Sequence, residues 1–371
     1  MNILIIEPFF SGSHKSWITE LKHYSRYTIE VLSLPGRHWK WRMSGGAITL
    51  AKMYNDHGFA PDLILVSDML DVATFLSLTR KTTCHVPIAI YFHENQLTYP
   101  WSEQDRDIEN KRDHHYVFKN FTSALCADAV YFNSAYHMDS FLNSLPAFLK
   151  QFPDYNELKS VEEIKAKSSV LYLGLDLKKF NEFKCNCQTS PPLLLWNHRW
   201  EYDKNPEDFF NAILTLDQRG IDFQVAVLGE KYAKYPKIFD IAKEKLKDKI
   251  IAFGYCETFE EYAKWLWKAD IIPVTNNQDF FGISIMEAVY CNTIPLLPER
   301  LTYPELFMHK KNKNLFYRDF KELVTKLEEI MHNIFIYKNN IQQLVAIAEQ
   351  YYWGNSIQTY DEVFRNLSKS K

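Results

Sequence analysis

Short apolar runs alternate with longer amphipathic segments along the whole chain. In the first half, these runs predict buried strands at residues 3–6, 29–34, 63–66, 88–92, 129–133 and 170–173. After a polar stretch, the runs resume and predict strands at residues 193–196, 223–228, 250–253, 271–274 and 294–297. Between them, segments such as 236–247, 259–268 and 320–334 have the apolar spacing of helices. Strands that alternate with helices in this way indicate parallel sheets covered by helices.

The pattern predicts two α/β domains of the doubly wound, Rossmann-like type. A length of 371 residues suits two domains of about 150 to 190 residues each. We expect an N-terminal domain at residues 1–183, a second domain at 184–350 and a C-terminal helix at 351–371 that crosses back to the first domain. The polar stretch 178–192 is the expected linker. We expect the two domains to face a central cleft, with the carboxyl edge of each sheet turned toward it. Doubly wound proteins bind ligands at that edge.

Composition and charge narrow the class of protein. The chain is 46% hydrophobic and 24% charged with a net charge of −3, so a nucleic-acid partner would need a local basic patch. No apolar run approaches the roughly 20 residues that span a bilayer, and Met1 leads directly into a strand pattern. We therefore expect a cytoplasmic protein with no membrane segment and with free thiols. Cys185 and Cys187 form a single C-x-C, and zinc would require a second pair of ligands.

Asp279 and Glu287 are the most informative pair of side chains. Seven residues, including Gly282, separate them; Asp279 follows an expected strand and Glu287 lies in an expected helix. The loop and helix start would offer backbone N–H groups to phosphate or sugar oxygens. We predict that Asp279 holds hydroxyls of a transferred sugar and that Glu287 holds the ribose of its nucleotide carrier. The alternative is a helix-capping Asp and a solvated Glu.

Two further loops follow the first strand of each half. Arg199 and Lys204 come after the strand at 193–196 and before a helix expected near Pro206, where their charges would stabilise a departing diphosphate. Gly12 and Ser13 follow the first strand, and small residues there let backbone amides approach a diphosphate. The alternative for these two is an ordinary turn with Ser13 as the helix N-cap. The sequence has no G-x-G-x-x-G at this loop, which argues against a nicotinamide cofactor.

Two segments of the first half have the chemistry of an acceptor site. The first interleaves fixed cations with indoles, which pair with phosphates and stack on unpaired bases; its residues are Arg37, Trp39, Lys40, Trp41 and Arg42. The alternative is a tryptophan pair that pins a loop, with solvated cations. The second segment follows the strand at 88–92 and groups His93, Glu94, Asn95 and Gln96. His93 is the candidate for contacting the donor sugar or the acceptor. The basic run 309–313 is interpreted as a solvated turn.

The motifs together resemble the tRNA-queuosine alpha-mannosyltransferase family, within the family 4 glycosyltransferases. The resemblance rests on residues 7–15, 39–42, 92–100, 197–204, 280–290 and 303–305. It implies the GT-B fold, GDP-mannose as donor and the cyclopentenediol of queuosine in the anticodon of tRNA-Asp as acceptor. It also implies donor contacts from Gly229, Tyr255, Phe281, Gly282 and Ile283. Asp279 stands where family 4 usually has Glu, and Asn292 stands where it usually has Gly.

The resemblance also implies retention of configuration at the sugar. We expect attack from the face of the leaving group, with the leaving phosphate as proton acceptor, because no carboxylate is assigned beneath the anomeric carbon. No Asp-x-Asp signature follows a strand at a suitable place, so neither a metal nor another cofactor is expected. The alternatives are a GT-B transferase with a glycan or lipid acceptor, a nucleotide-sugar epimerase and a non-catalytic binding protein. The residues leave the nucleotide base, the sugar and the oligomeric state open.

Overall fold

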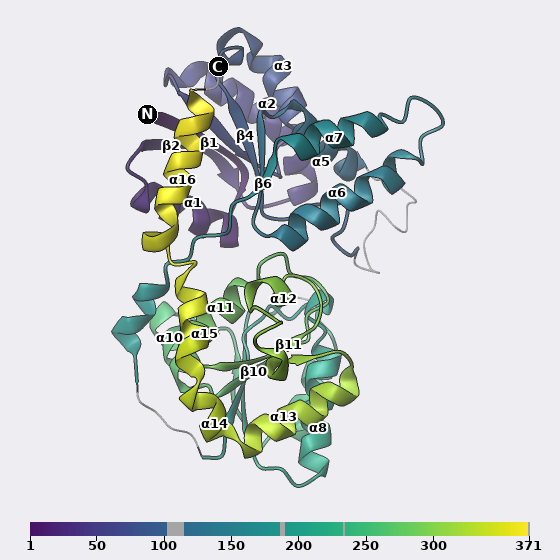
Figure 1. The fold of residues 1–371 in the computed structure, drawn as a ribbon, viewed down its shortest axis with the longest axis vertical. Coiled ribbons are helices and arrows are strands. Elements are labelled where there is room, and N and C mark those ends of the chain that lie inside the picture. The colour runs from purple at the N-terminus through teal and green to yellow at the C-terminus, as the bar shows by residue number, and fades with distance from the viewer. Residues whose placement is uncertain (102–114, 186–189, 233, 370–371) are drawn as a thin grey trace. The chain divides into compact units, whose positions relative to one another are not determined.

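The computed structural model divides into two compact units (Figure 1). It describes residues 1–101, 115–185, 190–232 and 234–369. Unit 1 comprises Met1–Leu175 and Trp353–Lys371, and unit 2 comprises Asp176–Tyr352. The division therefore lies before the expected boundary at residue 183, and the C-terminal segment is part of unit 1. Among the described residues, no helix has both the length and the apolarity to cross a bilayer.

Unit 1 is a six-stranded parallel sheet in the order β2-β1-β3-β4-β5-β6. Its strands are β1 (Asn2–Phe10), β2 (Thr28–Pro35), β3 (Leu63–Ser67), β4 (Ile88–Phe92), β5 (Ala129–Phe132) and β6 (Ser168–Val170). Its helices are α1 (Gly12–Tyr24), α2 (Trp39–His57), α3 (Val72–Thr83), α5 (His115–Cys126), α6 (Ala135–Leu149), α7 (Leu158–Ala166) and α16 (Trp353–Ser368). The strand order reverses at β1, so the topological switch point lies between β1 and β3.

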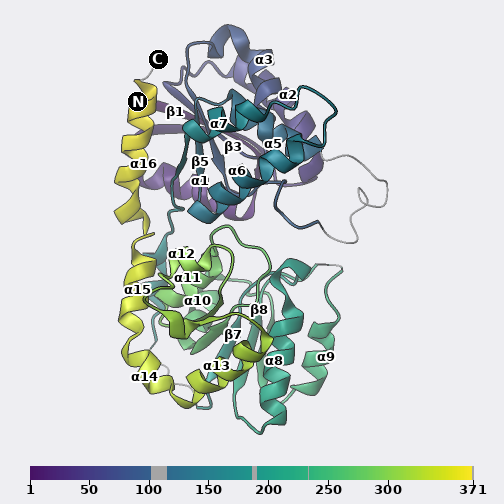
Figure 2. The same ribbon diagram turned by 45° about the vertical axis from the view of Figure 1, so that its right-hand side comes forward.

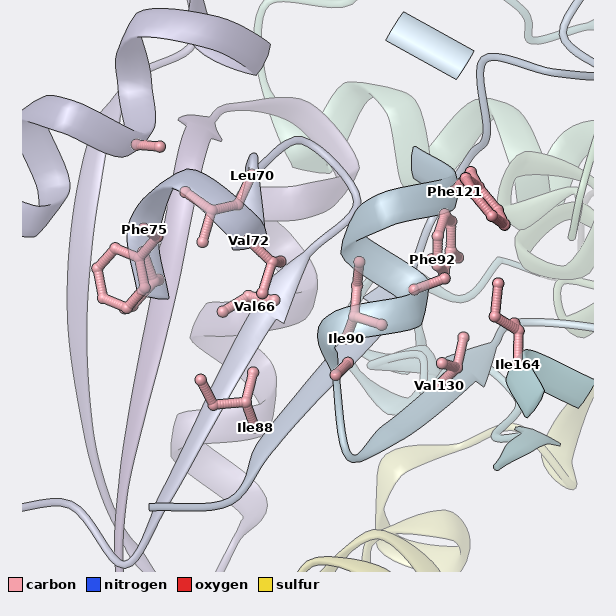
Figure 3. Close-up of a cluster of buried hydrophobic side chains, with 14 of the residues drawn as sticks. Val66, Leu70, Val72, Phe75, Ile88, Ile90, Phe92, Phe121, Val130 and Ile164 are labelled. Carbon is pink, nitrogen blue, oxygen red and sulfur yellow. The ribbon is translucent and has the colours of Figure 1, made fainter. Parts of the chain in front are cut away.

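The larger core of unit 1 lies between the sheet and the helices α2, α3, α5, α6 and α7. Branched side chains of the central strands, among them Val66, Ile88 and Ile90, pack there with Phe75 and Phe121 (Figure 3). On the opposite face, α1 and α16 run side by side (Figure 1). A sheet covered on both faces requires nearly continuous apolar strands, which is why the sequence pattern predicts it.

Unit 2 is a second six-stranded parallel sheet, in the order β12-β11-β10-β7-β8-β9. Its strands are β7 (Leu193–Trp196), β8 (Gln224–Leu228), β9 (Ile250–Gly254), β10 (Ile271–Pro273), β11 (Ile294–Pro298) and β12 (Phe316–Tyr317). The order reverses at β7, so this switch point lies between β7 and β10. The sequence pattern missed β12, because two residues carry no readable period.

Helices cover both faces of the second sheet. They are α8 (Pro206–Gln218), α9 (Ile238–Lys245), α10 (Phe259–Lys268), α11 (Ile283–Tyr290), α12 (Tyr303–Leu306), α13 (Phe320–His332), α14 (Ile334–Asn339) and α15 (Ile341–Glu349), with 3₁₀ turns η1 (Leu177–Phe183), η2 (Tyr202–Lys204) and η3 (Lys313–Leu315). Helix α8 lies beside α9 and α13 (Figure 2), and α11 lies beside α15. The predicted α/β class with two doubly wound sheets is confirmed.

Three local expectations differ from the structure. The first strand continues to Phe10 instead of ending at residue 6, so α1 begins at Gly12 with Ser11, not Ser13, as its N-cap. The expected linker 178–192 begins with η1, whose Phe180 is buried against Phe259. The strand expected at 170–173 is instead Ser168–Val170.

Helix α16 packs on the face of unit 1 that carries α1. Trp17 Nε1 donates to Tyr360 Oη at 3.3 Å, and Trp353 Nε1 donates to Glu20 Oε2 at 2.7 Å. Gly174 lies directly beneath the Trp353 ring, where a Cβ would meet the indole at 2.3 Å. The absence of a side chain at Gly174 therefore lets α16 pack closely on unit 1.

Candidate functional site

In unit 2, the charged residues gather at the switch point between β7 and β10. Lys204 follows β7 and is 9% exposed; its Nζ lies 2.9 Å from Asp279 Oδ1 and 3.1 Å from Asp203 Oδ2. The same amine donates to the carbonyl of Gln278 at 2.8 Å. The structure therefore joins Lys204 and Asp279, two of the predicted site residues, in a direct ion pair.

Both members of this pair stay charged. Burial alone would lower the pKa of Lys204, but the carboxylates of Asp279 and Asp203 outweigh it and raise that pKa. Burial would likewise raise the pKa of Asp279, but Lys204 and its other partners lower it. Asp279 Oδ2 also accepts from Tyr303 Oη at 2.6 Å and from Asn276 Nδ2 at 2.6 Å. The carboxylate of Asp279 is thus fixed by three donors.

Glu287 lies on α11, the helix predicted for it. Its Oε2 accepts from Tyr262 Oη at 2.8 Å. Helix α11 starts after Gly282, whose φ of +83° is left-handed and whose Cβ would crowd Ile285 and Tyr303 at 3.3 Å. Glycine is therefore required here, and the first turn beyond it offers N–H groups that lack helical partners. This turn has the geometry of an anion site.

The other predicted donor residues lie on the loops after β7, β8, β9 and β10 and at the start of α11. Arg199 is exposed and pairs with Glu201 at 3.2 Å. Gly229 has a φ of +112°, and a Cβ there would lie 2.0 Å from the carbonyl oxygen of His198. Tyr255 follows β9 and is 63% exposed, so its ring is accessible for stacking on a base. Phe281 is buried, and Ile283 is the first residue of α11.

Sequence reasoning missed a connection between the two loops of this site. His198 Nδ1 lies 3.1 Å from Ser284 Oγ, and Asn197 Nδ2 donates to the carbonyl of Ser284 at 2.9 Å. Burial lowers the pKa of His198 to about 4, so its ring is neutral. These residues tie the loop that carries Arg199 to the first turn of α11. The one sequence signal for Asn197 and His198 was their position just before Arg199, a predicted site residue.

In unit 1, a buried cluster of acids and histidines occupies the switch point between β1 and β3. Glu7 lies on β1, and its Oε2 is 2.9 Å from Nδ1 of His14 on α1. Burial would lower the pKa of His14, but the Glu7 carboxylate outweighs it and raises that pKa to about 9. The ring of His14 packs on the ring of His93, with centroids 4.2 Å apart. Sequence reasoning missed the Glu7–His14 ion pair.

His93 lies at the predicted place, directly after β4. Its backbone N–H donates to Asp68 Oδ1 at 2.8 Å, and its ring stands edge-on to Trp17 with centroids 4.8 Å apart. Burial, together with the charge of His14 and the nearby His137, holds the pKa of His93 well below its ordinary value. The imidazole is therefore neutral and fixed by its neighbours.

The three residues after His93 form a turn. Asn95 Oδ1 accepts from the backbone N–H groups of Leu97 and Thr98 at 3.1 and 2.9 Å, so its carbonyl shapes the chain. Gln96 Nε2 donates to Glu94 Oε1 at 3.1 Å. The polar cluster expected here is present, but Asn95 is fully buried and its oxygen is taken by the turn.

Gly12 and Ser13 open helix α1. Both are exposed, and Gly12 has a φ of +51° with nothing within 4 Å of a Cβ built on it. The backbone here is open to close approach by a ligand.

The cation and indole segment begins a helix and is not a loop. Trp39 is the first residue of α2 and packs on Tyr116 at 5.2 Å between centroids, beside buried Met43 and Met69. Trp41 is 62% exposed. The two indoles therefore differ: one joins a small apolar cluster and the other faces solvent.

The cations of this segment also differ from one another. Lys40 Nζ lies over the rings of Trp39 and Trp101, at 5.5 and 5.6 Å from their centroids. Arg42 Nε donates to the carbonyl of Pro35 at 3.2 Å. Arg37 is exposed on the approach to the helix. Arg37 thus faces solvent, whereas the charged groups of Lys40 and Arg42 contact other parts of unit 1.

Among the described residues, no three His, Cys, Asp or Glu side chains group in a way that could hold a metal ion. Cys185 of the C-x-C is partly buried, whereas Cys187 lies outside the described residues.

Comparison with known proteins gives the two units separate matches. Residues 2–175 match the family described as tRNA-queuosine alpha-mannosyltransferase N-terminal, and residues 178–344 match glycosyl transferases group 1. The chain is 37% identical over 317 residues to the tRNA-queuosine alpha-mannosyltransferase of Drosophila melanogaster, covering 82% of this chain and 81% of that protein.

Solved structures agree on the fold. Sucrose-phosphate synthase from Thermosynechococcus elongatus superposes with a TM-score of 0.74 at 13% identity and covers 100% of both chains. A glycosyltransferase from Rickettsia africae superposes with a TM-score of 0.69 at 14% identity, covering 100% of this chain and 99% of the other. These confirm the GT-B fold. The 37% identity to the Drosophila protein, together with the two family matches, shows that the chain belongs to the tRNA-queuosine alpha-mannosyltransferase family and is a glycosyltransferase.

Proposed function

We propose that this protein transfers mannose from GDP-mannose to the cyclopentenediol of queuosine in the anticodon of tRNA-Asp, with retention at the anomeric carbon. The observation that carries the proposal is the charged Lys204–Asp279 pair at the switch point of unit 2. The 37% identity of the chain to the tRNA-queuosine alpha-mannosyltransferase of Drosophila melanogaster supports it. Because the acceptor is a tRNA, we place the reaction in the cytoplasm.

In this proposal, unit 2 binds the donor. Lys204 and Arg199 offset the negative charge that grows on the departing GDP, which is the main electrostatic task of the transfer. The first turn of α11, beyond Gly282, binds diphosphate oxygens, and Glu287 binds the ribose. Asp279 orients a sugar hydroxyl, and its three donors keep it in place.

The transfer itself proceeds on one face of the sugar. The bond between the anomeric carbon and the phosphate oxygen breaks, and a bond to an acceptor hydroxyl oxygen forms on the same face. The hydroxyl proton passes to the released phosphate oxygen, so the products are GDP and mannosyl-queuosine. The neutral ring of His93 contributes a hydrogen bond to the donor sugar or the acceptor and carries no proton away. No metal ion takes part in this scheme.

The proposal is tested by incubating the protein with GDP-mannose and queuosine-containing tRNA-Asp, followed by digestion and nucleoside mass spectrometry. We expect a hexose on queuosine and none when the same tRNA carries guanosine at that position. UDP-glucose and UDP-galactose serve as competing donors, and NMR of the isolated nucleoside gives the anomeric configuration. Transfer from a UDP-sugar, or the absence of a hexose on queuosine, would reject the assignment.

A further inference from the structure

Three buried polar atoms at the ends of neighbouring strands have no hydrogen-bond partner within the described part of the chain. They are Ser67 Oγ at the end of β3, Asp68 Oδ2 directly after it, and Nε2 of His93 directly after β4. Asp68 is 1% exposed. An unpaired buried carboxylate oxygen is costly in a folded protein. Such a group is retained where a ligand completes it, and here three lie at the carboxyl edge of one sheet.

The rest of Asp68 is already engaged. Oδ1 accepts the backbone N–H of His93 at 2.8 Å, and the Asp68 carbonyl accepts from Asn120 Nδ2 at 2.9 Å. Asn120 in turn accepts the backbone N–H of Gln96 at 2.9 Å. One carboxylate oxygen therefore fixes the start of the turn at residue 93, and the second is held in a set direction beside it.

The surrounding charges suit a neutral, hydroxyl-bearing ligand. Burial raises the pKa of Asp68 to about 8, although the nearby His14 cation acts to lower it and Glu94 acts to raise it. The positive charge of His14 is already paired with Glu7 at 2.9 Å. A hydroxyl bonded to Oδ2 would complete the buried carboxyl group without adding charge, whereas a phosphate would be repelled by the neighbouring Glu7 and Glu94.

We propose that Asp68 is a binding residue of the acceptor site, and that its Oδ2 forms a hydrogen bond with a hydroxyl of the cyclopentenediol. The inference rests on the proposed function, and it names the carboxyl group that distinguishes queuosine from the guanosine it replaces.

The decisive variant is Asp68→Asn. Asparagine keeps Oδ1 as the acceptor for the His93 N–H and turns only the unpaired oxygen into an NH₂ group. We expect kcat/KM for queuosine-tRNA to fall about 10- to 100-fold, the scale of one buried hydrogen bond lost with its partner left unsatisfied. The KM for GDP-mannose and the slow hydrolysis of GDP-mannose without tRNA should stay at the wild-type values.

A second measurement separates binding from structural support. Wild-type protein should bind queuosine-tRNA more tightly than the same tRNA with guanosine, and Asp68→Asn should lose most of that preference while still binding both. Asp71→Asn is the matched control, because both oxygens of Asp71 have partners, Thr74 N at 3.0 Å and Lys119 Nζ at 2.8 Å.

The outcomes are distinguishable. If wild-type protein modifies queuosine and Asp68→Asn retains both its kcat/KM and its preference for queuosine-tRNA, the inference is wrong and the proposed function stands. If Asp68→Asn instead raises the KM for GDP-mannose, Asp68 serves the donor and the inference is again wrong. If wild-type protein adds no hexose to queuosine, the proposed function fails and the inference fails with it.

Discussion

The two units place a buried carboxylate at the same point of the same kind of sheet but complete it differently. Asp279 of unit 2 is held by Lys204, Asn276 and Tyr303. Asp68 of unit 1 has one oxygen bonded to the backbone of His93 and one unpaired. The cation beside Asp279 suits a site that also binds the charge of a diphosphate, whereas the half-satisfied Asp68 suits a neutral hydroxyl. The comparison assigns the diphosphate charge to unit 2, while each unit offers a carboxyl group to a hydroxyl.

Replacement of Lys204 has the largest expected effect, and it tests the proposal that unit 2 binds the charged diphosphate. Lys204→Met leaves the buried carboxylate of Asp279 without its cation and removes a positive charge from the diphosphate site. We expect turnover to fall by about two to four orders of magnitude, the scale of one lost transition-state charge contact. Arg199→Ala should fall in the same range, since it is predicted to share the task.

Both variants are checked by measuring single-turnover transfer to queuosine-tRNA. The melting temperature, measured in parallel, shows whether each variant is folded. The control is Lys249→Met, which removes a partly buried lysine that pairs with Asp217 at 3.2 Å on another part of unit 2. Wild-type turnover in a folded Lys204 variant would remove Lys204 from the mechanism, and the contrast between the two units would lose its basis.

The carboxylates of unit 2 should divide their roles between sugar and nucleotide. Glu287→Gln keeps an acceptor for Tyr262 Oη and should weaken the binding of GDP about tenfold or more, because a hydrogen bond from the ribose to a charged group is lost. Asp279→Asn should leave GDP binding nearly unchanged while impairing transfer. Calorimetric titration with GDP separates the two, with Glu260→Gln, an exposed change on α10, as control. Equal losses of GDP affinity in both variants would contradict the division.

The binding of tRNA by unit 1 should depend on the salt concentration. A protein with a net charge of −3 can attract a polyanion only through a local basic patch. Replacement of Arg37, Lys40 and Arg42 by Ala should raise the KM for tRNA several-fold and flatten its salt dependence by about 0.7 to 0.9 per lost phosphate contact. GDP-mannose hydrolysis without tRNA should hardly change. The matched control replaces Lys310, Lys311 and Lys313, the basic turn of unit 2, by Ala. A larger effect from the control would move the tRNA site to that turn.

Most of the fold was predictable because parallel strands that are buried on both faces appear in the sequence as nearly continuous apolar runs. Strand β4 and helix α10 lie where their patterns predicted them. The helix that begins within the segment at 37–42 was not predicted, because α2 starts at Trp39 after His38 in a left-handed conformation (φ 54°) without a side-chain cap. His38 is not one of the residue types preferred at a helix N-cap, so the sequence does not predict that a helix starts at Trp39.

The site of unit 2 was easier to predict than the site of unit 1. Asp279 and Glu287 are close in sequence, and Lys204 follows a strand with a clear pattern. In unit 1, Glu7, Asp68 and His93 come from three strands, and only the sheet order that places β3 between β1 and β4 brings them together. The sequence groups His93 with its polar neighbours, but Glu7 and Asp68 carry no sequence signal that links them to it.

The smallest expected effect concerns the stability of the buried pair in unit 1. The pKa of His14 is raised to about 9 in the folded protein, above its ordinary value of about 6.5 in the unfolded chain. A raised pKa contributes stability that is fully present below pH 6.5 and is lost as the pH rises through about 9. The groups that face His14 are Glu7, Asp68, Glu94 and His93.

His14→Gln should therefore be less stable than wild type at pH 6, and the gap in melting temperature should narrow by roughly several degrees as the pH rises to 9.5. Burial raises the pKa of Asp68 to about 8 and the His14 cation acts to lower it, so the contribution of Asp68 differs between the two proteins and the gap in melting temperature reports His14 and Asp68 together. The control His57→Gln removes a partly exposed histidine beside Glu30 and should show a gap that changes little over this range. A gap for His14→Gln that stays constant from pH 6 to 9.5 would show that His14 is not a paired cation. The cluster around Asp68 would then lack the fixed positive charge that balances its acids, and hydroxyl recognition by unit 1 would need another explanation.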